Sequence, residues 1–254
     1  MVQKRVIPIV LVKNGQVVRS QSFKIHQTIG NPINTIRRLN DWGADELILL
    51  DISTDDFHDL KRDDMYVKYK SSDTISLINR IAHESFMPLT IGGRVDSISK
   101  FSEYLAAGAD KVSINTVALE NPRFIQEASK VFGSQCVIVS IDYKTDPSGK
   151  KIVFSNGGRK DAGIELFDWC KKAQDYGAGE VLVNSIDRDG IGNGYDLETL
   201  DELSNHLTIP VIGCGGAGSY SDFSSLLKNT NVSAASAANI FHYKELSYPF
   251  AKKE

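Results

Sequence analysis

Short apolar runs alternate with longer amphipathic stretches along the whole chain. The apolar runs have the length of buried strands, and the last is rich in alanine and serine: Val6–Val12, Leu47–Leu50, Met87–Ile91, Lys111–Ile114, Val137–Ile141, Val181–Val183, Ile209–Ile212 and Val232–Ala238. Continuous apolar strands separated by helices are typical of a parallel sheet that is covered on both faces. The pattern therefore predicts a chain of β-α units.

Helical spacing fills the segments between these runs. Ile33, Ile36 and Leu39 follow Pro32 at helical intervals, and Pro122 marks the first position of another helix. Eight β-α units in a chain of 254 residues predict a (β/α)₈ barrel. The alternative is a doubly wound open sheet, but no G-x-G-x-x-G fingerprint follows the first strand.

An internal repeat indicates that the barrel consists of two similar halves. The segment Asp41–Leu47 (DWGADEL) returns as Asp175–Val181 (DYGAGEV), and Pro88–Gly93 (PLTIGG) is similar to Pro210–Gly216 (PVIGCGG). A half-barrel cannot bury its own strands. We therefore expect residues 1–254 to form a single domain.

Composition narrows the class of protein. Acidic residues outnumber basic ones by 32 to 29, so the net charge of −3 does not favour nucleic acid or an anionic membrane as a partner. No apolar run approaches the ~18 residues of a membrane span, and the first residues do not have the layout of a signal peptide. Three widely separated cysteines predict a reduced, cytoplasmic protein.

Two glycine pairs end predicted strands in corresponding places of the two halves. They are Gly92-Gly93 and Gly215-Gly216, and short polar residues end the strands that follow: Asn115, Thr116 and Asn239. Glycines let backbone amides approach an anion, and the helix that follows adds the positive end of its dipole. Each pair alone could simply turn a strand into a helix. Their recurrence predicts a ligand with two phosphate groups.

Asp142 ends the fifth predicted strand, Val137–Asp142. A carboxylate at the mouth of an apolar barrel can have a raised pKa and act as a general acid or base, although it could also cap a helix or form an ion pair. The corresponding place in the first strand holds Leu11, which cannot transfer a proton.

Four charged residues stand at strand starts, at the opposite mouth of the predicted barrel: Arg5, Glu46, Lys111 and Glu180. They could form a ring of alternating charge. From the residues alone, solvated surface charges are the favoured interpretation.

Other polar features carry no recognisable chemistry. The five histidines lack the spacing of metal ligands, so no metal and no other cofactor is predicted. The stretch Asp55–Asp64 is acidic but lacks the glycine and the terminal glutamate of a calcium loop. We interpret it as a solvated excursion on the catalytic face, where it could form a lid or contact a substrate.

Several longer motifs show that the chain resembles the cyclase subunit of imidazole glycerol phosphate synthase, from histidine biosynthesis. The matching motifs span nearly the whole chain: Lys4–Pro8 (KRVIP), Gly43–Leu47 (GADEL), Gly108–Asn115 (GADKVSIN), Phe132–Gln135 (FGSQ), Ser185–Gly190 (SIDRDG) and Ile240–His242 (IFH). The resemblance implies a (β/α)₈ barrel whose amino-terminal mouth docks a glutaminase subunit. Ammonia from that subunit would pass through the barrel to a bisphosphorylated substrate, a phosphoribulosyl formimino aminoimidazole carboxamide ribotide.

The resemblance also implies roles for particular residues. Asp142 is similar to the catalytic acid, the ring at the strand starts to the gate of the ammonia channel, and Asp110 to a residue facing the glutaminase. The phosphate and substrate contacts would be made by Gly92, Gly93, Asn115, Thr116, Asp189, Gly190, Gly215, Gly216 and Asn239.

The chain departs from the family pattern at the carboxyl mouth. Leu11 stands where the family has a second essential aspartate, and loss of a positioned acid–base group costs a factor of about 10²–10⁴ in rate. Asn184 replaces a threonine, Arg94 replaces a glycine after the first glycine pair, and Cys214 and Asn239 replace serines.

Three functions remain open on the sequence. The first is an ammonia-dependent cyclase of the imidazole glycerol phosphate synthase type. The second is a paralogue that has lost the cyclase activity, activates a glutaminase and delivers ammonia for amidination of a surface-polysaccharide sugar. The third is a phosphoribosyl isomerase of a sibling barrel family, which also requires aspartates on strands one and five, so Leu11 disfavours it.

Overall fold

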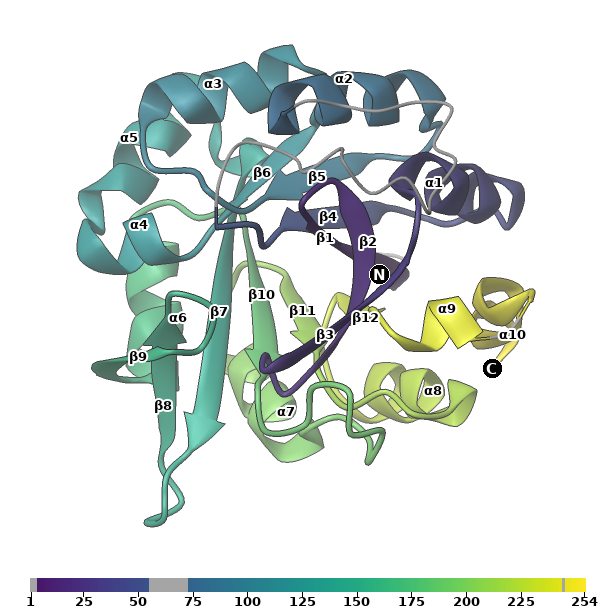
Figure 1. Ribbon diagram of the computed structural model, residues 1–254. Coiled ribbons are helices and arrows are strands. Elements are labelled where there is room, and N and C mark those ends of the chain that lie inside the picture. The colour runs from purple at the N-terminus through teal and green to yellow at the C-terminus, as the bar shows by residue number, and fades with distance from the viewer. Residues whose placement is uncertain (1–3, 55–72, 244) are drawn as a thin grey trace.

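A closed parallel barrel forms the centre of the molecule (Figure 1). The computed structural model describes residues 4–54, 73–243 and 245–254. Within these residues, eight parallel strands form the ring: β1 (Arg5–Lys13), β4 (Leu47–Asp51), β5 (Leu89–Gly92), β6 (Lys111–Ile114), β7 (Val137–Thr145), β10 (Glu180–Ser185), β11 (Val211–Cys214) and β12 (Ala234–Ala237). Pairing of β7 with β10 and of β12 with β1 closes the ring. This confirms the predicted (β/α)₈ barrel.

Helices cover the outside of this ring (Figure 1). They are α1 (Pro32–Asp41), α2 (Thr74–Glu84), α3 (Ile98–Ala106), α4 (Thr116–Glu120), α5 (Arg123–Phe132), α6 (Leu166–Asp175), α7 (Leu197–His206), α8 (Tyr220–Asn229), α9 (Ile240–Tyr243) and α10 (Ser247–Lys253), with a 3₁₀ turn, η1, at Ser134–Cys136. Side-chain caps begin several of them. Asn31 accepts a bond from the Ile33 amide, Asp73 from Ser76 and Ser97 from Lys100.

Two apolar clusters make up the core. The larger lies between the strands and the helices. The smaller fills the barrel with branched side chains and is formed by Ile7, Ile9, Ile48, Ile138, Leu182, Ile212, Cys214 and Ala234, with Leu11, Leu50 and Ala238 packed against it. Successive residues of a strand point to opposite faces, so most barrel strands contribute to both clusters, whereas β5 and β6 contribute only to the larger one.

Two antiparallel hairpins, which the sequence pattern did not predict, extend from the carboxyl mouth. One follows β1 and contains β2 (Gln16–Gln21) and β3 (Ile25–Gly30), and the other follows β7 and contains β8 (Lys151–Ser155) and β9 (Lys160–Glu165). β3 and β9 are largely exposed, so neither has an apolar run. The hairpins occupy corresponding places and agree with a barrel built from two similar halves.

The remaining local predictions are mostly confirmed. Each apolar run overlaps a barrel strand, and the helix predicted after Pro32 is α1. Pro122, predicted as the first helical residue, instead caps α5, which begins one residue later. The stretch Asp55–Asp64 lies outside the described residues. Among the described helices, none combines the length and apolarity that crossing a membrane requires.

Candidate functional site

Asp142 lies at the carboxyl mouth of the barrel, almost fully buried, near the end of β7. Asn115 follows β6, and its Nδ2 donates to Asp142 Oδ2 at 2.8 Å. Asn184 lies on β10, and its Nδ2 donates to Asp142 Oδ1 at 3.3 Å. Two amides from the neighbouring strands therefore hold the two carboxylate oxygens, one each, and fix the plane of the carboxyl group.

Burial raises the pKa of Asp142 to about 7. The nearby Asp189 adds to this shift, whereas the hydrogen bonds from Asn184 and Asn115 oppose it. A carboxyl group with a pKa near neutrality can donate or accept a proton at physiological pH, which is the property that a general acid or base requires. The sequence predicted Asn115 as a substrate contact and showed Asn184 as a departure from the family pattern. That both amides bind Asp142 depends on β6 and β10 being the neighbours of β7 in the barrel.

The positions of the first half that correspond to Asp142 and Asn184 are apolar. Leu11 pairs with Leu50 across β1 and β4, in the arrangement that Asp142 and Asn184 have across β7 and β10. Both leucines are partly buried and pack against the cluster inside the barrel. Leu11 therefore stands in the place of β1 that corresponds to Asp142 in β7, and it offers no group for proton transfer there.

The first glycine pair sits tightly between β5 and its neighbour β4. Gly93 has φ +92°, and a Cβ atom there would lie 1.9 Å from the Asp51 carbonyl oxygen. The buried Tyr104, from α3, donates from its hydroxyl to the Gly93 carbonyl at 3.1 Å. On the next strand, Asn115 precedes α4, and the Thr116 hydroxyl accepts a bond from the Asn156 amide.

The second glycine pair is equally constrained. A Cβ atom on Gly215 would lie 2.7 Å from the Ser185 carbonyl oxygen, and one on Gly216 would lie 2.1 Å from that of Gly194. Both residues have positive φ angles. Close approach of the backbone explains why glycine stands at these positions. Both glycine pairs stand at the carboxyl ends of barrel strands, so the two halves of the predicted phosphate site lie at the same mouth.

Asp189, Gly190 and Asn239 contact the hairpin that follows β1. Asp189 accepts bonds from the Ser20 hydroxyl and the Phe23 amide, and Asn239 bonds both the amide and the carbonyl of Ser20. A Cβ on Gly190 would lie 2.5 Å from the Ser20 carbonyl oxygen. The hairpin is therefore hydrogen-bonded to residues of the predicted second phosphate site, which the sequence did not indicate.

Two further carboxylates at the carboxyl mouth, Asp51 and Asp187, form hydrogen bonds with neighbouring residues. Asp51 accepts bonds from Ser53 and Thr74 and is buried at the end of β4. Asp187 accepts from the Thr145 amide. Within the described residues, no group of three or more His, Cys, Asp or Glu side chains converges in the manner of a metal site.

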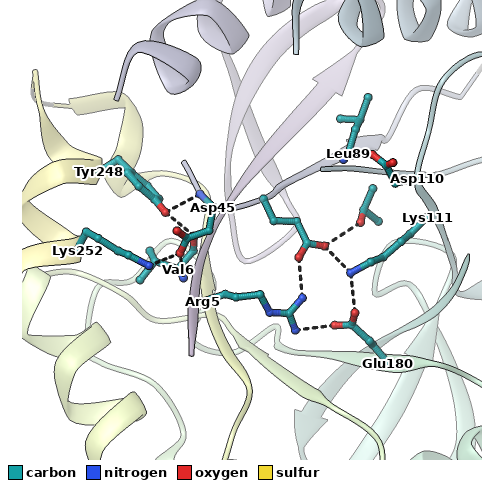
Figure 2. A network of polar contacts seen from close by, with 11 residues as sticks. Arg5, Val6, Asp45, Leu89, Asp110, Lys111, Glu180, Tyr248 and Lys252 are labelled. Carbon is teal, nitrogen blue, oxygen red and sulfur yellow. Dashed lines mark hydrogen bonds and ion pairs between the residues drawn. The ribbon is translucent and has the colours of Figure 1, made fainter. Parts of the chain in front are cut away.

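The four charges at the strand starts form a closed ring at the amino-terminal mouth (Figure 2). Arg5 bonds Glu46 at 2.6 Å and Glu180 at 2.8 Å, while Lys111 bonds Glu46 at 2.9 Å and Glu180 at 2.6 Å. The Glu46 and Glu180 side chains are only 4% and 12% exposed. The interpretation as separate solvated charges was therefore wrong, because barrel closure brings the four strand starts together.

The ring shifts the pKa of its members in the directions expected of ion pairs. Burial alone would lower the pKa of Arg5 and of Lys111, but the bonds to Glu180 and Glu46 outweigh it and raise both. Burial would likewise raise the pKa of Glu180, but Arg5 and Lys111 lower it. Arg5, Lys111 and Glu180 are thus held in their charged forms.

Asp110 and a second polar network lie at the same mouth (Figure 2). Asp110 is exposed and accepts a bond from the Leu89 amide at 2.7 Å. Asp45 accepts bonds from the Val6 amide and from Lys252. The Tyr248 hydroxyl donates to the Val6 carbonyl and accepts from the Asp45 amide, so α10 is fastened to β1 and to the start of β4.

Comparison with known proteins decides the family. A family model described as histidine biosynthesis protein matches residues 5–247. The chain belongs to this histidine biosynthesis family. Within it, the chain is 41% identical over 256 residues to the imidazole glycerol phosphate synthase subunit HisF of Lactococcus lactis, covering 100% of this chain and 94% of the relative.

Other members of the family are equally similar. The subunit HisF of Clostridium botulinum is 41% identical over 249 residues, covering 97% of this chain and 93% of the relative. That of Bacillus cereus is 40% identical over 254 residues, covering 100% and 96%. The chain is therefore a HisF-type member of the histidine biosynthesis family, as its motifs predicted.

Proposed function

We propose that this chain is the cyclase subunit of an imidazole glycerol phosphate synthase. It receives ammonia from a glutaminase partner and uses it to convert a phosphoribulosyl formimino aminoimidazole carboxamide ribotide into imidazole glycerol phosphate and an aminoimidazole carboxamide ribotide. The observation that carries the proposal is the placement of the charged ring at one mouth of the barrel and of Asp142 at the other. We further propose that residues 1–254 work as one barrel domain.

At the carboxyl mouth, Asp142 supplies the acid–base group. Its raised pKa leaves both protonation states populated near neutral pH, so it can give a proton to a leaving nitrogen or take one from an attacking one. Asn115 and Asn184 keep its oxygens in place. The two glycine pairs hold the two phosphates of the substrate, with Asn115 and Thr116 beside the first, and Asp189, Gly190 and Asn239 beside the second.

At the amino-terminal mouth, the ring of Arg5, Glu46, Lys111 and Glu180 acts as the gate. Charge-assisted bonds close the ring, and uncharged ammonia passes when one bond opens. Asp110 stands on the same surface and faces the glutaminase. Such a subunit works in the cytoplasm, and the free cysteines Cys136, Cys170 and Cys214 suit a reducing compartment.

The test is turnover of the ribotide by the purified protein with an ammonium salt, which removes the need for a partner. We expect formation of imidazole glycerol phosphate, and its loss in Asp142→Asn. Leu11→Asp adds the carboxylate, and Leu11→Asn is the matched control without a charge. No turnover by the natural protein, together with turnover by Leu11→Asp, would contradict the proposal.

Leu11 favours a second candidate function. Leu11 and Leu50 stand where the other half has Asp142 and Asn184, so the first half lacks a counterpart of the Asp142 acid, while the ring at the opposite end is complete. The second candidate is a conduit that activates a glutaminase and passes ammonia to another enzyme, for amidination of a surface-polysaccharide sugar such as a nonulosonic or uronic acid. It requires that glutaminase activity depend on this protein and that Arg5→Ala alter ammonia delivery. Absence of any stimulation of a glutaminase would exclude it.

A further inference from the structure

Arg94 has an unusual backbone conformation at the carboxyl mouth. It follows Gly92 and Gly93 directly, at the end of β5, and its φ angle is +62°. Residues with a Cβ atom rarely adopt this left-handed region, and those that do are mostly Asn and Asp. Strained residues of this kind cluster at active sites and ligand sites, where the surrounding structure holds them and the strain is part of the function.

The peptide bond before Arg94 has a defined orientation. Tyr104, from α3 on the outside of the barrel, donates to the Gly93 carbonyl at 3.1 Å. In a planar trans peptide the carbonyl and the following N–H point in opposite directions. The Arg94 amide therefore points away from the Tyr104 hydroxyl and from α3.

The guanidinium of Arg94 lies at the carboxyl mouth. Its Nη1 donates to the Ser53 carbonyl at 3.3 Å, so the half-buried side chain reaches from β5 across the end of β4. A guanidinium presents five N–H donors in a planar fork, which fits a phosphate or carboxylate better than an ammonium group does.

The other half of the barrel has a comparable arrangement. A Cβ atom on Gly216 would lie 3.2 Å from Arg188 Cβ, and Arg188 Nη1 donates to the Gly194 carbonyl at 3.1 Å. Each glycine pair thus has one arginine next to it, and a backbone carbonyl holds Nη1 of that arginine in each case. This recurrence at Arg188 is independent of the strain at Arg94.

We infer that Arg94 completes the first anion site, as a specificity-determining residue whose guanidinium binds a phosphate group of the substrate. The glycine pair provides backbone donors, and Arg94 provides the positive charge that neither glycine can supply. The inference rests on the proposed function, which brings a phosphorylated ligand to this mouth. It predicts that the first site prefers a dianionic phosphate to an uncharged group.

The test is a titration of the isotope-labelled protein with inorganic phosphate at constant ionic strength, followed by NMR. The Gly93 amide reports on the first site and the Gly216 amide on the second. In Arg94→Gly we expect the phosphate affinity measured at Gly93 to fall about 10- to 100-fold, because a hydrogen bond to a charged group is lost. The affinity measured at Gly216 should change by less than about twofold, since distant sites act independently.

Stability separates a ligand-binding role from a structural one. Arg94→Gly also relieves the left-handed backbone, so its thermal midpoint should equal or exceed that of the natural protein. Leu246→Gly is the matched control, because Leu246 has φ +58° at the start of α10 and is exposed. It should leave phosphate binding at Gly93 unchanged. Arg94→Lys keeps the charge without the fork, and its affinity should lie between those of the natural protein and Arg94→Gly.

Three results would overturn the inference. They are an absence of phosphate binding at Gly93 in the natural protein, an unchanged affinity at Gly93 in Arg94→Gly, and a loss of stability in Arg94→Gly without a loss of phosphate affinity. The titration needs no turnover, so its outcome is distinguishable from failure of the ammonia-dependent assay. An active cyclase with unchanged phosphate binding in Arg94→Gly would refute the role of Arg94 and keep the proposed function.

Discussion

Leu11 and Asp142 occupy equivalent positions in the two halves of the barrel. Leu11 is the first residue of β1 that pairs with the antiparallel β2, and Asp142 is the first residue of β7 that pairs with the antiparallel β8. Each also pairs with the next barrel strand, Leu11 with Leu50 and Asp142 with Asn184. The two halves therefore share one backbone plan, but at these paired positions the side chains are apolar in one half and polar in the other.

The pKa of Asp142 predicts a pH-dependent stability. Because its pKa rises from 3.8 to about 7 on folding, the folded state holds a proton that the unfolded state has lost. The contribution of Asp142 to the free energy of unfolding is complete below about pH 4. It is lost as the pH rises to 7, a difference of about 4 kcal/mol. Urea unfolding at a series of pH values should show this decline, and Asp142→Asn should lack it.

Asp196 provides the control for that experiment. Burial would raise the pKa of Asp196, but bonds from Tyr143, Thr199 and Lys151 outweigh it and lower the pKa. The contribution of Asp196 to stability is present at pH values above the pKa that its carboxyl group has in the unfolded chain. It is lost as the pH falls through the lower pKa of the folded protein. Asp196→Asn should therefore remove a dependence of the opposite sign. An equal slope for Asp142→Asn and the natural protein would contradict the raised pKa.

Removal of Arg5 should destabilise the protein. Arg5→Ala leaves Glu46 and Glu180 with Lys111 as their only remaining partner in the ring, and Glu46 is almost fully buried. We expect a loss of about 2–4 kcal/mol in the free energy of unfolding, reduced from the value for fully buried pairs because Arg5 is partly exposed. Arg37→Ala breaks an exposed pair of the same length, with Glu84, and should cost about 0–1 kcal/mol. Equal losses in the two variants would show that the ring is no stronger than a surface ion pair.

Gly93 should not tolerate a side chain, for steric reasons beyond its φ angle. Gly93 and Gly149 have nearly the same φ, +92° and +89°, but a Cβ on Gly93 meets the Asp51 carbonyl, whereas nothing lies within 4 Å at Gly149. Gly149→Ala should therefore cost about 1–2 kcal/mol, the backbone penalty alone. Gly93→Ala should cost about 4 kcal/mol or more and disrupt phosphate binding. Similar unfolding midpoints for the two variants would refute the close approach of β5 to β4.

Tyr248 should contribute to stability through its hydroxyl. Tyr248→Phe removes the bonds to the Val6 carbonyl and the Asp45 amide, and leaves both backbone groups without that partner. We expect a loss of about 1–3 kcal/mol, measured by chemical denaturation. Tyr243→Phe is the control, because Tyr243 is exposed and its hydroxyl accepts only from Arg19 in the described contacts, so about 0.5 kcal/mol or less should be lost. An unchanged free energy of unfolding in Tyr248→Phe would mean that α10 is held by its apolar contacts alone.

Much of the fold was predictable because buried parallel strands have a strong local signature. The run Val181–Val183 is apolar throughout, and only Ser140 interrupts the run Val137–Ile141, since both faces of these strands are covered. The hairpin strands β3 and β9 were not predictable, because exposed strands are stabilised by backbone pairing and carry no apolar pattern. The same distinction applies to the site. The ends of the predicted strands pointed to Asp142 and to the glycine pairs, but the contact of Asn239 with Ser20 depends on the hairpin that the sequence did not predict.

The sequence by itself determined the barrel, its division into two halves, the acid at the end of β7 and the leucine in the corresponding place of β1. Only the tertiary structure decided how charges far apart in the chain interact. Arg5, Glu46, Lys111 and Glu180 have the local pattern of surface charges, and they form a buried ring because barrel closure brings the starts of β1, β4, β6 and β10 together. The hydrogen bonds from Asn115 and Asn184 to Asp142 likewise form because barrel closure makes β6 and β10 the neighbours of β7. Hydrophobic periodicity is a local property of the chain, whereas the partner of a polar side chain depends on which strand becomes its neighbour.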